Sequence, residues 1–277
     1  MIGYRNLFVI FSVGILATVS VNQAFAPGEF PPLLNVVKFY DVNANGQYDP
    51  GTDQTIRNWK ISINGQIQFT PFINFFTPGS QLTVTEFDAI EKNWFATTPK
   101  SFTRTMVAGE ISSVNFGNLC IGKGNGNTPG FWSGQNGQAI INDGGEVDSE
   151  MTLLQNLNLK DDTGADFDPI SYDQFRTWLL GANAANMSYM LSAHLAAMAL
   201  NVESGIVSGT SVLYVPGLTS SGFISINDLI DLANNSLAAG DPKATQESLK
   251  NALEQGNNGQ NYVQPTPCQF TFKKSSK

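Results

Sequence analysis

The segment KFYDVNANGQYD, residues 38–49, decides the fold expected for the first half of this chain. Its first residues end an apolar, β-branched run. From Asp41 onward, every second side chain carries oxygen. Alternating oxygen ligands with glycine at the sixth position are the spacing of a calcium-binding loop, because glycine allows the sharp bend. The sequence therefore predicts a strand that ends in a calcium loop. The ligands expected there are Asp41, Asn43, Asn45, Gln47, Asp49 and Asp53.

The expected calcium loop departs from its usual pattern near its end. The twelfth position, normally a bidentate acid, holds Thr52, and Asp53 follows one place later. A loop longer by one residue would bring Asp53 to the ion. With so few carboxylates the expected affinity is weak, about 0.1–1 mM. The alternative is a hairpin turn rich in Asn, Asp and Gly that holds no ion.

Short runs over residues 34–119 have the composition of β-strands. They are rich in Val, Ile, Thr, Phe and Trp, and Asn-Gly or Pro-Gly turns separate them. This pattern is typical of a β-sandwich, and we expect Trp59, Phe87 and Trp94 in its core. The predicted strands are Asn35–Tyr40, Arg57–Ile63, Leu82–Phe87, Trp94–Thr98 and Ile111–Asn118.

The apolar spacing becomes helical from about Asn142. The sequence therefore predicts an α+β protein, with a β-sandwich over residues 27–120 and a mainly helical domain over 142–277. Residues 121–141 are expected to be a glycine-rich connector, which is a hinge or domain junction. It lacks the lysine and hydroxyl spacing of a phosphate loop. The expected helices are Tyr172–Leu180, Asn183–Val202, one after the capping box of Ser225 and Asp228, and one from Asp241-Pro242 that Gly256 ends.

Residues 1–26 are predicted to be a secretory signal peptide. Arg5 precedes an apolar run over Leu7–Val21, and Ala24-Phe25-Ala26 forms a small-x-small cleavage site. The run is shorter than the roughly 20 residues that span a bilayer. We therefore expect a secreted or cell-surface protein with no integral membrane span after cleavage. A retained anchor is the alternative, and Pro27 leaves the cleavage point open because proline hinders signal peptidases.

The chain contains two cysteines, Cys120 and Cys268. An even pair in an exported chain suggests a disulfide, and two separate buried thiols are the alternative. The bond would tie the end of the first domain to the C-terminal tail. The net charge of -8 argues against nucleic-acid binding, which needs a basic face.

A set of motifs in residues 34–119 points to a known family. They are KFYDxNxNG from Lys38, then Trp59, then PGxxLTVTE from Pro78, then Trp94 with Thr97-Thr98-Pro99, and VNFGN from Val114. Their order resembles the B domains of bacterial serine-aspartate-repeat (SD-repeat) adhesins, relatives of the collagen-adhesin (Cna-B) domains. The resemblance implies a Greek-key, prealbumin-like sandwich, calcium in the acidic loop, and a stalk or spacer role on a cell surface. Thr52 is a departure that weakens the calcium expectation.

Some relatives in that family carry an internal isopeptide bond between a lysine and an asparagine. The matching residues here are Lys38, Glu86 as the promoting acid, and Asn115 or Asn118. The reaction needs a neutral amine against the amide and a protonated carboxylic acid, and burial shifts both pKa values in that direction. The alternative is a surface lysine beside an ordinary strand glutamate.

The helical half offers two catalytic candidates. Asp161, Asp162, Asp166 and Asp168 would bind calcium or act as the paired acids of a glycosidase. A solvated loop in which Asp168-Pro169 starts a helix is the simpler interpretation. A serine or cysteine hydrolase would depend on His194, for which a buried core position is the alternative.

We therefore expect an exported, non-catalytic structural or adhesion module, with calcium as its one cofactor. Its partners would be other surface or matrix proteins or glycans. The first alternative is a glycan- or protein-binding module in which the helical domain holds the ligand. An exposed aromatic patch around Phe131 and Trp132 would support it. The second alternative is a secreted hydrolase that uses the acidic cluster.

Overall fold

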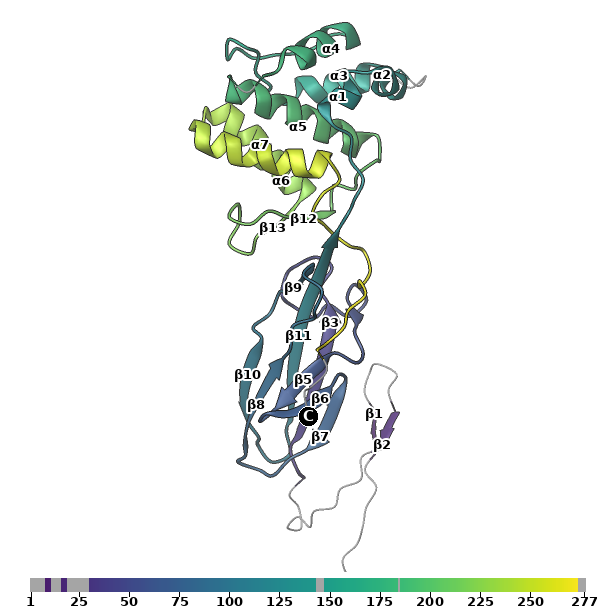
Figure 1. Ribbon diagram of the computed structural model, residues 1–277, viewed down its shortest axis with the longest axis vertical. Coiled ribbons are helices and arrows are strands. Elements are labelled where there is room, and N and C mark those ends of the chain that lie inside the picture. The colour runs from purple at the N-terminus through teal and green to yellow at the C-terminus, as the bar shows by residue number, and fades with distance from the viewer. Residues whose placement is uncertain (1–7, 11–15, 19–29, 143–146, 184, 274–277) are drawn as a thin grey trace, which may run out of the picture. The chain divides into compact units, whose positions relative to one another are not determined.

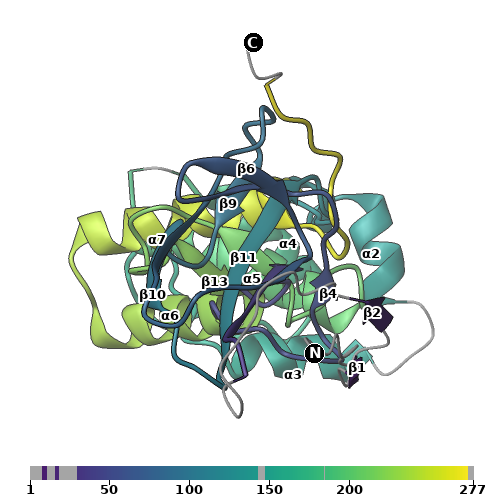
Figure 2. The same ribbon diagram turned by 90° about the horizontal axis from the view of Figure 1, so that it is seen from below.

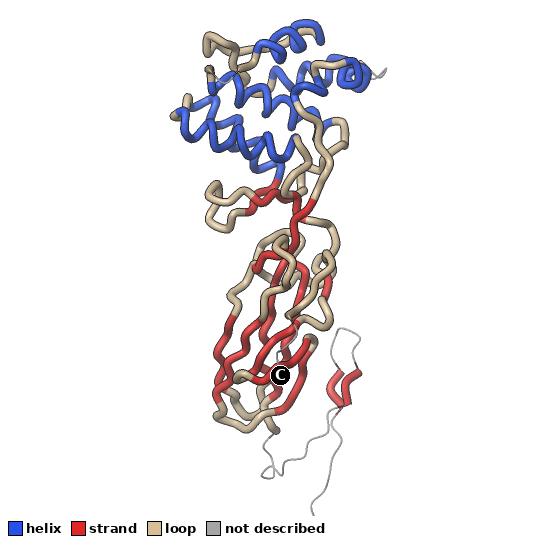
Figure 3. Tube along the Cα trace, viewed as in Figure 1, coloured by secondary structure: helices blue, strands red, loops and turns tan. Residues whose placement is uncertain are grey.

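The computed structural model describes residues 8–10, 16–18, 30–142, 147–183 and 185–273. The chain divides into two compact units (Figure 1), and each is described separately. The first comprises the described residues of Met1–Leu119 and Thr266–Lys277, and the second comprises those of Cys120–Pro265. The first is built of strands and the second mainly of helices (Figure 3), so the chain is α+β as expected. The C-terminal tail groups with the strands, although the sequence assigned it to the helical domain.

The strand unit contains two sheets that form a sandwich-like region. One has the order β10-β8-β5-β6 and is antiparallel throughout. In the other, β3 pairs in parallel with β11 and antiparallel with β4 and β7, while β9 pairs with β11. The bounds are β3 Leu33–Tyr40, β4 Gln54–Thr55, β5 Lys60–Ile63, β6 Gln66–Phe69, β7 Phe72–Phe75, β8 Gln81–Glu86, β9 Trp94–Ala96, β10 Ser101–Thr105 and β11 Ile111–Gly122.

Alternation along the strands defines the core of this unit. On β8, the second, fourth and sixth residues are buried, and they are Leu82, Val84 and Glu86. This period of two is that of a strand with one face buried. All five predicted strands are present with shifted ends, and Trp59 is fully buried. Phe87 and Trp94 are only partly buried, and β4, β6, β7 and β10 were not predicted.

The helical unit is organised around α5, which is apolar on nearly every side and therefore buried. The predicted capping box is confirmed, since the Ser225 hydroxyl accepts a hydrogen bond from the backbone N–H of Asp228. The bounds are α1 Pro129–Trp132, α2 Gln135–Ile141, α3 Val147–Gln155, α4 Tyr172–Gly181, α5 Met187–Glu203, α6 Ile226–Ala239 and α7 Lys243–Asn257, with strands β12 Val212–Tyr214, β13 Phe223–Ser225 and β14 Tyr262–Val263.

Three local expectations in this unit need correction. The connector begins at the boundary between the two units, but it also contains the unpredicted helices α1 and α2, and a Cβ on Gly126 would lie 2.4 Å from the Gly256 carbonyl oxygen. Gly256 lies inside α7 instead of ending it. Asp168-Pro169 does not start a helix, since Ser171 is the N-cap of α4.

Most of the predicted signal peptide lies outside the described residues. Its described parts form a small antiparallel pair, β1 Phe8–Ile10 with β2 Leu16–Thr18. Among the described residues, none of the helices has both the length and the apolar character needed to span a membrane.

The predicted disulfide between Cys120 and Cys268 is confirmed. Cys120 lies near the end of β11, and Cys268 precedes the last described residues of the chain. The bond therefore closes a loop that contains the whole helical unit.

Reduction of this disulfide should lower the free energy of unfolding by roughly 4–5 kcal/mol, because a very long loop is released in the unfolded chain. Urea unfolding with and without reductant measures the difference. The Cys268→Ser variant should unfold at the urea midpoint of the reduced wild type, and reductant should not change that midpoint further. Equal midpoints for the oxidised and reduced wild type would contradict the prediction.

Candidate functional site

A buried ion pair lies in the core of the strand unit. Lys38 on β3 extends its amine to within 2.6 Å of Glu86 Oε2 on β8. Their side chains are 0% and 1% exposed, so Lys38 is not a surface lysine. Every second residue of a strand lies on the same face. Lys38 therefore shares the buried face of β3 with Val36 and Tyr40.

Asn118 lies on the neighbouring strand, on the same face as Lys38. In the parallel register of β3 and β11, Phe116 is opposite Lys38 and Asn118 is opposite Tyr40. Lys38 and Asn118 are therefore diagonal neighbours on one face of this parallel pair. Asn118 is 4% exposed. Asn115 is opposite Val37 on the other face and only half-buried, so of the two candidate asparagines only Asn118 faces the buried pair.

Two oxygens at this site lack hydrogen-bond donors. Neither Glu86 Oε1 nor Asn118 Oδ1 has a partner among the described residues, although both are buried. A buried acceptor without a donor costs about 1–3 kcal/mol. A proton on Glu86 Oε1 would turn this oxygen from an acceptor into a donor.

Burial also favours the neutral forms of both ionisable groups. Desolvation lowers the pKa of Lys38 from 10.5 to about 8, against the opposing attraction of Glu86. Desolvation likewise raises the pKa of Glu86 above its ordinary value. A neutral amine is a nucleophile, and a neutral carboxylic acid can donate a hydrogen bond to an amide oxygen. The site thus combines a nucleophile and an amide on the adjacent strands β3 and β11 with a proton donor on β8 of the other sheet.

An aromatic residue forms one wall of this site. The Trp59 ring lies 4.7 Å from the Lys38 amine, and the Trp59 indole N–H donates to the Phe87 carbonyl. Trp59 itself is fully buried. The sequence placed Trp59 in the core but gave no indication that it contacts the lysine.

The predicted calcium loop follows β3 directly, and its polar groups bond to one another. Both Asp41 carboxylate oxygens accept backbone N–H groups, from Asn45 and from Gly46. Asp49 accepts the side-chain amides of Asn43 and Asn45. These bonds hold the loop in a tight turn, with Gly46 at a φ of 74° that favours glycine.

The fit of this loop to calcium is partial. Asp53 accepts the backbone N–H of Asp49 through one oxygen, while its buried Oδ1 has no partner among the described residues. Desolvation, with the charges of Asp41 and Asp49, raises the pKa of Asp53, and a cation would relieve that repulsion. However, no three His, Cys, Asp or Glu side chains gather as a metal site anywhere in the described ranges. The calcium assignment stays a prediction.

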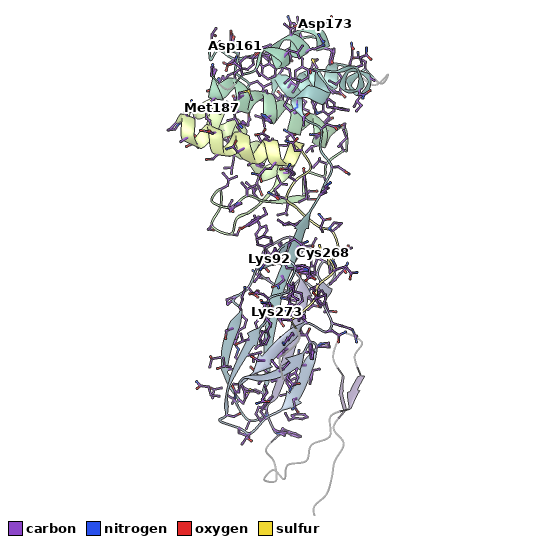
Figure 4. All side chains as sticks on the ribbon, in the orientation of Figure 1. Lys92, Asp161, Asp173, Met187, Cys268 and Lys273 are labelled. Atoms are coloured by element: carbon purple, nitrogen blue, oxygen red, sulfur yellow. The ribbon has the colours of Figure 1, made fainter. Side chains whose placement is uncertain are left out.

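The acidic candidates of the helical unit lie in an exposed loop. Asp161 accepts bonds from the Thr163 backbone and hydroxyl and from the Ala165 backbone, and the Thr163 hydroxyl is the main cause of its lowered pKa. Lys160 pairs with Asp166. Figure 4 labels Asp161 at the outside of this unit. These contacts are those of a local turn.

The aromatic patch expected around Phe131 and Trp132 is not exposed. Trp132 is 0% exposed, and Phe131 is half-buried with its ring against Trp132. These rings belong to the core of the helical unit, where Tyr172 donates its hydroxyl to the Trp132 carbonyl. The feature that would favour a binding site there is therefore missing.

Comparisons with known proteins return no relatives. No protein-family model matches the chain. No curated protein matches it. No solved structure matches it either.

His194 is a buried residue of α5 near Lys250 and Glu254 on α7, and its Nδ1 has no partner among the described residues. Desolvation lowers the pKa of His194 to about 4. The unfolded chain therefore binds a proton between about pH 6.5 and pH 4 that the folded chain does not. Stability should fall as pH falls through this window, by up to about 3 kcal/mol.

Urea unfolding of wild type and of His194→Gln at a series of pH values measures this loss. The difference between the two proteins should shrink as pH falls, because only the wild type carries the histidine. A constant difference from pH 7 to pH 4 would contradict the prediction.

Proposed function

We propose that this protein is an exported, non-catalytic structural or adhesion module of the cell surface or extracellular space. Its strand unit would be a Greek-key, prealbumin-like sandwich that is cross-linked internally between Lys38 and Asn118. Its partners would be other surface or matrix proteins or glycans. The observation that carries the proposal is the buried Lys38–Glu86 pair, together with buried Asn118, whose amide oxygen has no hydrogen-bond partner in the described part of the chain.

The cross-link needs no cofactor and balances within the chain. The neutral Lys38 amine attacks Cγ of Asn118, while protonated Glu86 donates a hydrogen bond to the amide oxygen. A C–N bond forms between Nζ and Cγ, and the bond from Cγ to Nδ2 breaks. Glu86 passes a proton from the amine to the leaving nitrogen, which departs as ammonia. The product is an amide that also removes the buried charge pair.

The position of the cross-link suits a module that bears load. β3 and β11 are the first and last long strands of the sandwich, and they pair in parallel over eight residues. Tension applied where the chain enters β3 and leaves β11 would act across this pairing. A covalent bond between Lys38 and Asn118 would transmit that force without breaking the hydrogen-bond ladder.

Calcium is the second element of the proposed function. The ion would be held by the carboxylates of Asp41, Asp49 and Asp53 and by oxygens of Asn43, Asn45 and Gln47. For this, the Asn43 and Asn45 side chains would turn their amide oxygens toward the ion. It would replace the internal hydrogen bonds of the loop and stiffen the end of β3. An affinity of about 0.1–1 mM would suit extracellular calcium levels.

The purified wild-type protein should be lighter than its mature sequence by one ammonia, about 17 Da, because the cross-link expels the Asn118 amide nitrogen. Intact mass spectrometry checks this. Asn118→Ala and Glu86→Ala should lack the loss, and Asn115→Ala should retain it. A wild-type mass equal to that of the uncross-linked chain would refute the cross-link.

Calcium at a few millimolar should raise the thermal unfolding temperature of the strand unit, and chelator should reverse the rise, since ligand binds only the folded loop. Calorimetry on the oxidised protein measures the shift. Asp53→Asn should reduce it, whereas Asp166→Asn in the helical unit should leave it unchanged. Identical transitions with calcium and with chelator would argue for the ion-free turn.

A further inference from the structure

The C-terminal tail, residues 266–273, completes the strand unit. After Cys268 its side chains alternate, with Phe270 and Phe272 half-buried and Thr271 and Lys273 exposed. It follows the strands in Figure 1, emerges beside β6 in Figure 2, and carries the labelled Cys268 and Lys273 in Figure 4. The alternation shows that one face of the tail packs on the unit.

Four groups of the strand unit bind this tail. The Trp94 indole N–H donates to the Gln269 carbonyl, and the Ile90 N–H donates to the Thr271 carbonyl. The Glu91 carboxylate accepts both the backbone N–H and the hydroxyl of Thr271, at 2.8 and 2.7 Å. Lys60 reaches the Lys273 carbonyl at 3.5 Å. The tail thus has a defined docking register.

The buried face of the tail rests on Trp59. The Phe270 and Phe272 rings lie 4.9 and 5.2 Å from the Trp59 ring, and Trp94 lies 5.1 Å from it. The same Trp59 ring lies 4.7 Å from the Lys38 amine. Trp59 therefore separates the tail from the buried pair, and these contacts contribute to its complete burial.

We propose that docking of the tail closes the Lys38–Glu86–Asn118 site, so that the cross-link forms only after the C-terminus has folded onto the strand unit. Phe270 and Phe272 are positioning residues that act through Trp59. This inference rests on the proposed cross-link and adds its timing.

The disulfide provides the anchor for this closure. Cys120 follows Asn118 by two residues, and Cys268 precedes Phe270 by two residues. The bond therefore holds the docking segment beside the strand that carries the reacting amide. Tethering raises the effective concentration of the tail at its site, so oxidation of the cysteines should promote closure.

The physical reason for a dependence on the tail is the exclusion of water. Desolvation is the largest cause of the lowered pKa of Lys38 and of the raised pKa of Glu86. An undocked tail would expose Trp59 and let water approach the pair. The amine would then spend more time charged, and a charged amine cannot attack the amide.

The decisive experiment follows ammonia loss by intact mass in full-length protein made by cell-free synthesis under oxidising conditions and quenched at intervals. The test variant combines Phe270→Ser with Phe272→Ser. Its cross-linking at pH 7 should be at least about tenfold slower than that of wild type, since one unit of pKa changes the neutral amine fraction about tenfold. The pH at which its cross-linking rate increases should also be higher than the corresponding pH of the wild type.

Three further proteins control this comparison. Phe69→Ser removes an exposed phenylalanine of β6 and should cross-link at the wild-type rate. Phe270→Leu combined with Phe272→Leu should restore most of the rate. Cys268→Ser should slow the reaction by loss of the anchor. If the serine double variant does not fold by circular dichroism, Phe272→Ser alone takes its place and is interpreted in the same way.

The outcomes separate the inference from the proposed function. A wild-type rate and pH profile in the folded tail variant, with ammonia loss intact, would overturn the inference and leave the cross-link standing. Absence of ammonia loss in wild type would overturn the cross-link and the inference with it. A slowed variant whose pH profile is displaced to higher pH supports both.

Discussion

The strand unit depends on how it accommodates a lysine in its apolar core. An ammonium group removed from water loses several kcal/mol of solvation, and one carboxylate partner returns only part of it. Lys38 nevertheless lies fully buried between two sheets, with Glu86 as its ion-pair partner. A leucine or methionine there would satisfy the core more simply. A buried ion pair is weak evidence for stability, and the proposed cross-link would give this one a chemical role.

Several other features acquire a common explanation from this constraint. Asn118 places on the same face an amide oxygen that has no donor among the described residues, and one Glu86 oxygen likewise has none there. Trp59 covers the amine, and two phenylalanines of the tail cover Trp59. Each feature alone is an ordinary imperfection of a core. Together they form a dry site in which neutral groups are favoured, as acyl transfer to an amine requires.

The sequence was most informative where chemistry and periodicity coincide. Alternation predicted that Lys38 and Glu86 lie on strands, but only the register of β3 and β11 distinguishes Asn118 from Asn115. The docking of Phe270 and Phe272 was not predictable, because a short segment with two aromatic residues has no periodic pattern long enough to assign. Helices α1 and α2 were missed because the glycines of the connector suggested a flexible loop. Gly126 is instead required by its close approach to Gly256, and Gly137 in α2 by its close approach to the Trp132 backbone.

The proposed closure also explains why a helical unit can be placed between β11 and the tail. Without a lock, unfolding of the long intervening segment would pull the tail from Trp59. The disulfide would prevent this because it joins Cys120 and Cys268 directly. The tail would then stay tethered to β11 even if the helical unit unfolded. The proposed cross-link at Asn118 would act two residues from Cys120, and it would be irreversible whereas the disulfide is reducible. A surface module that meets both tension and changing redox conditions would need both bonds, because each secures the strand unit against a stress that the other does not resist.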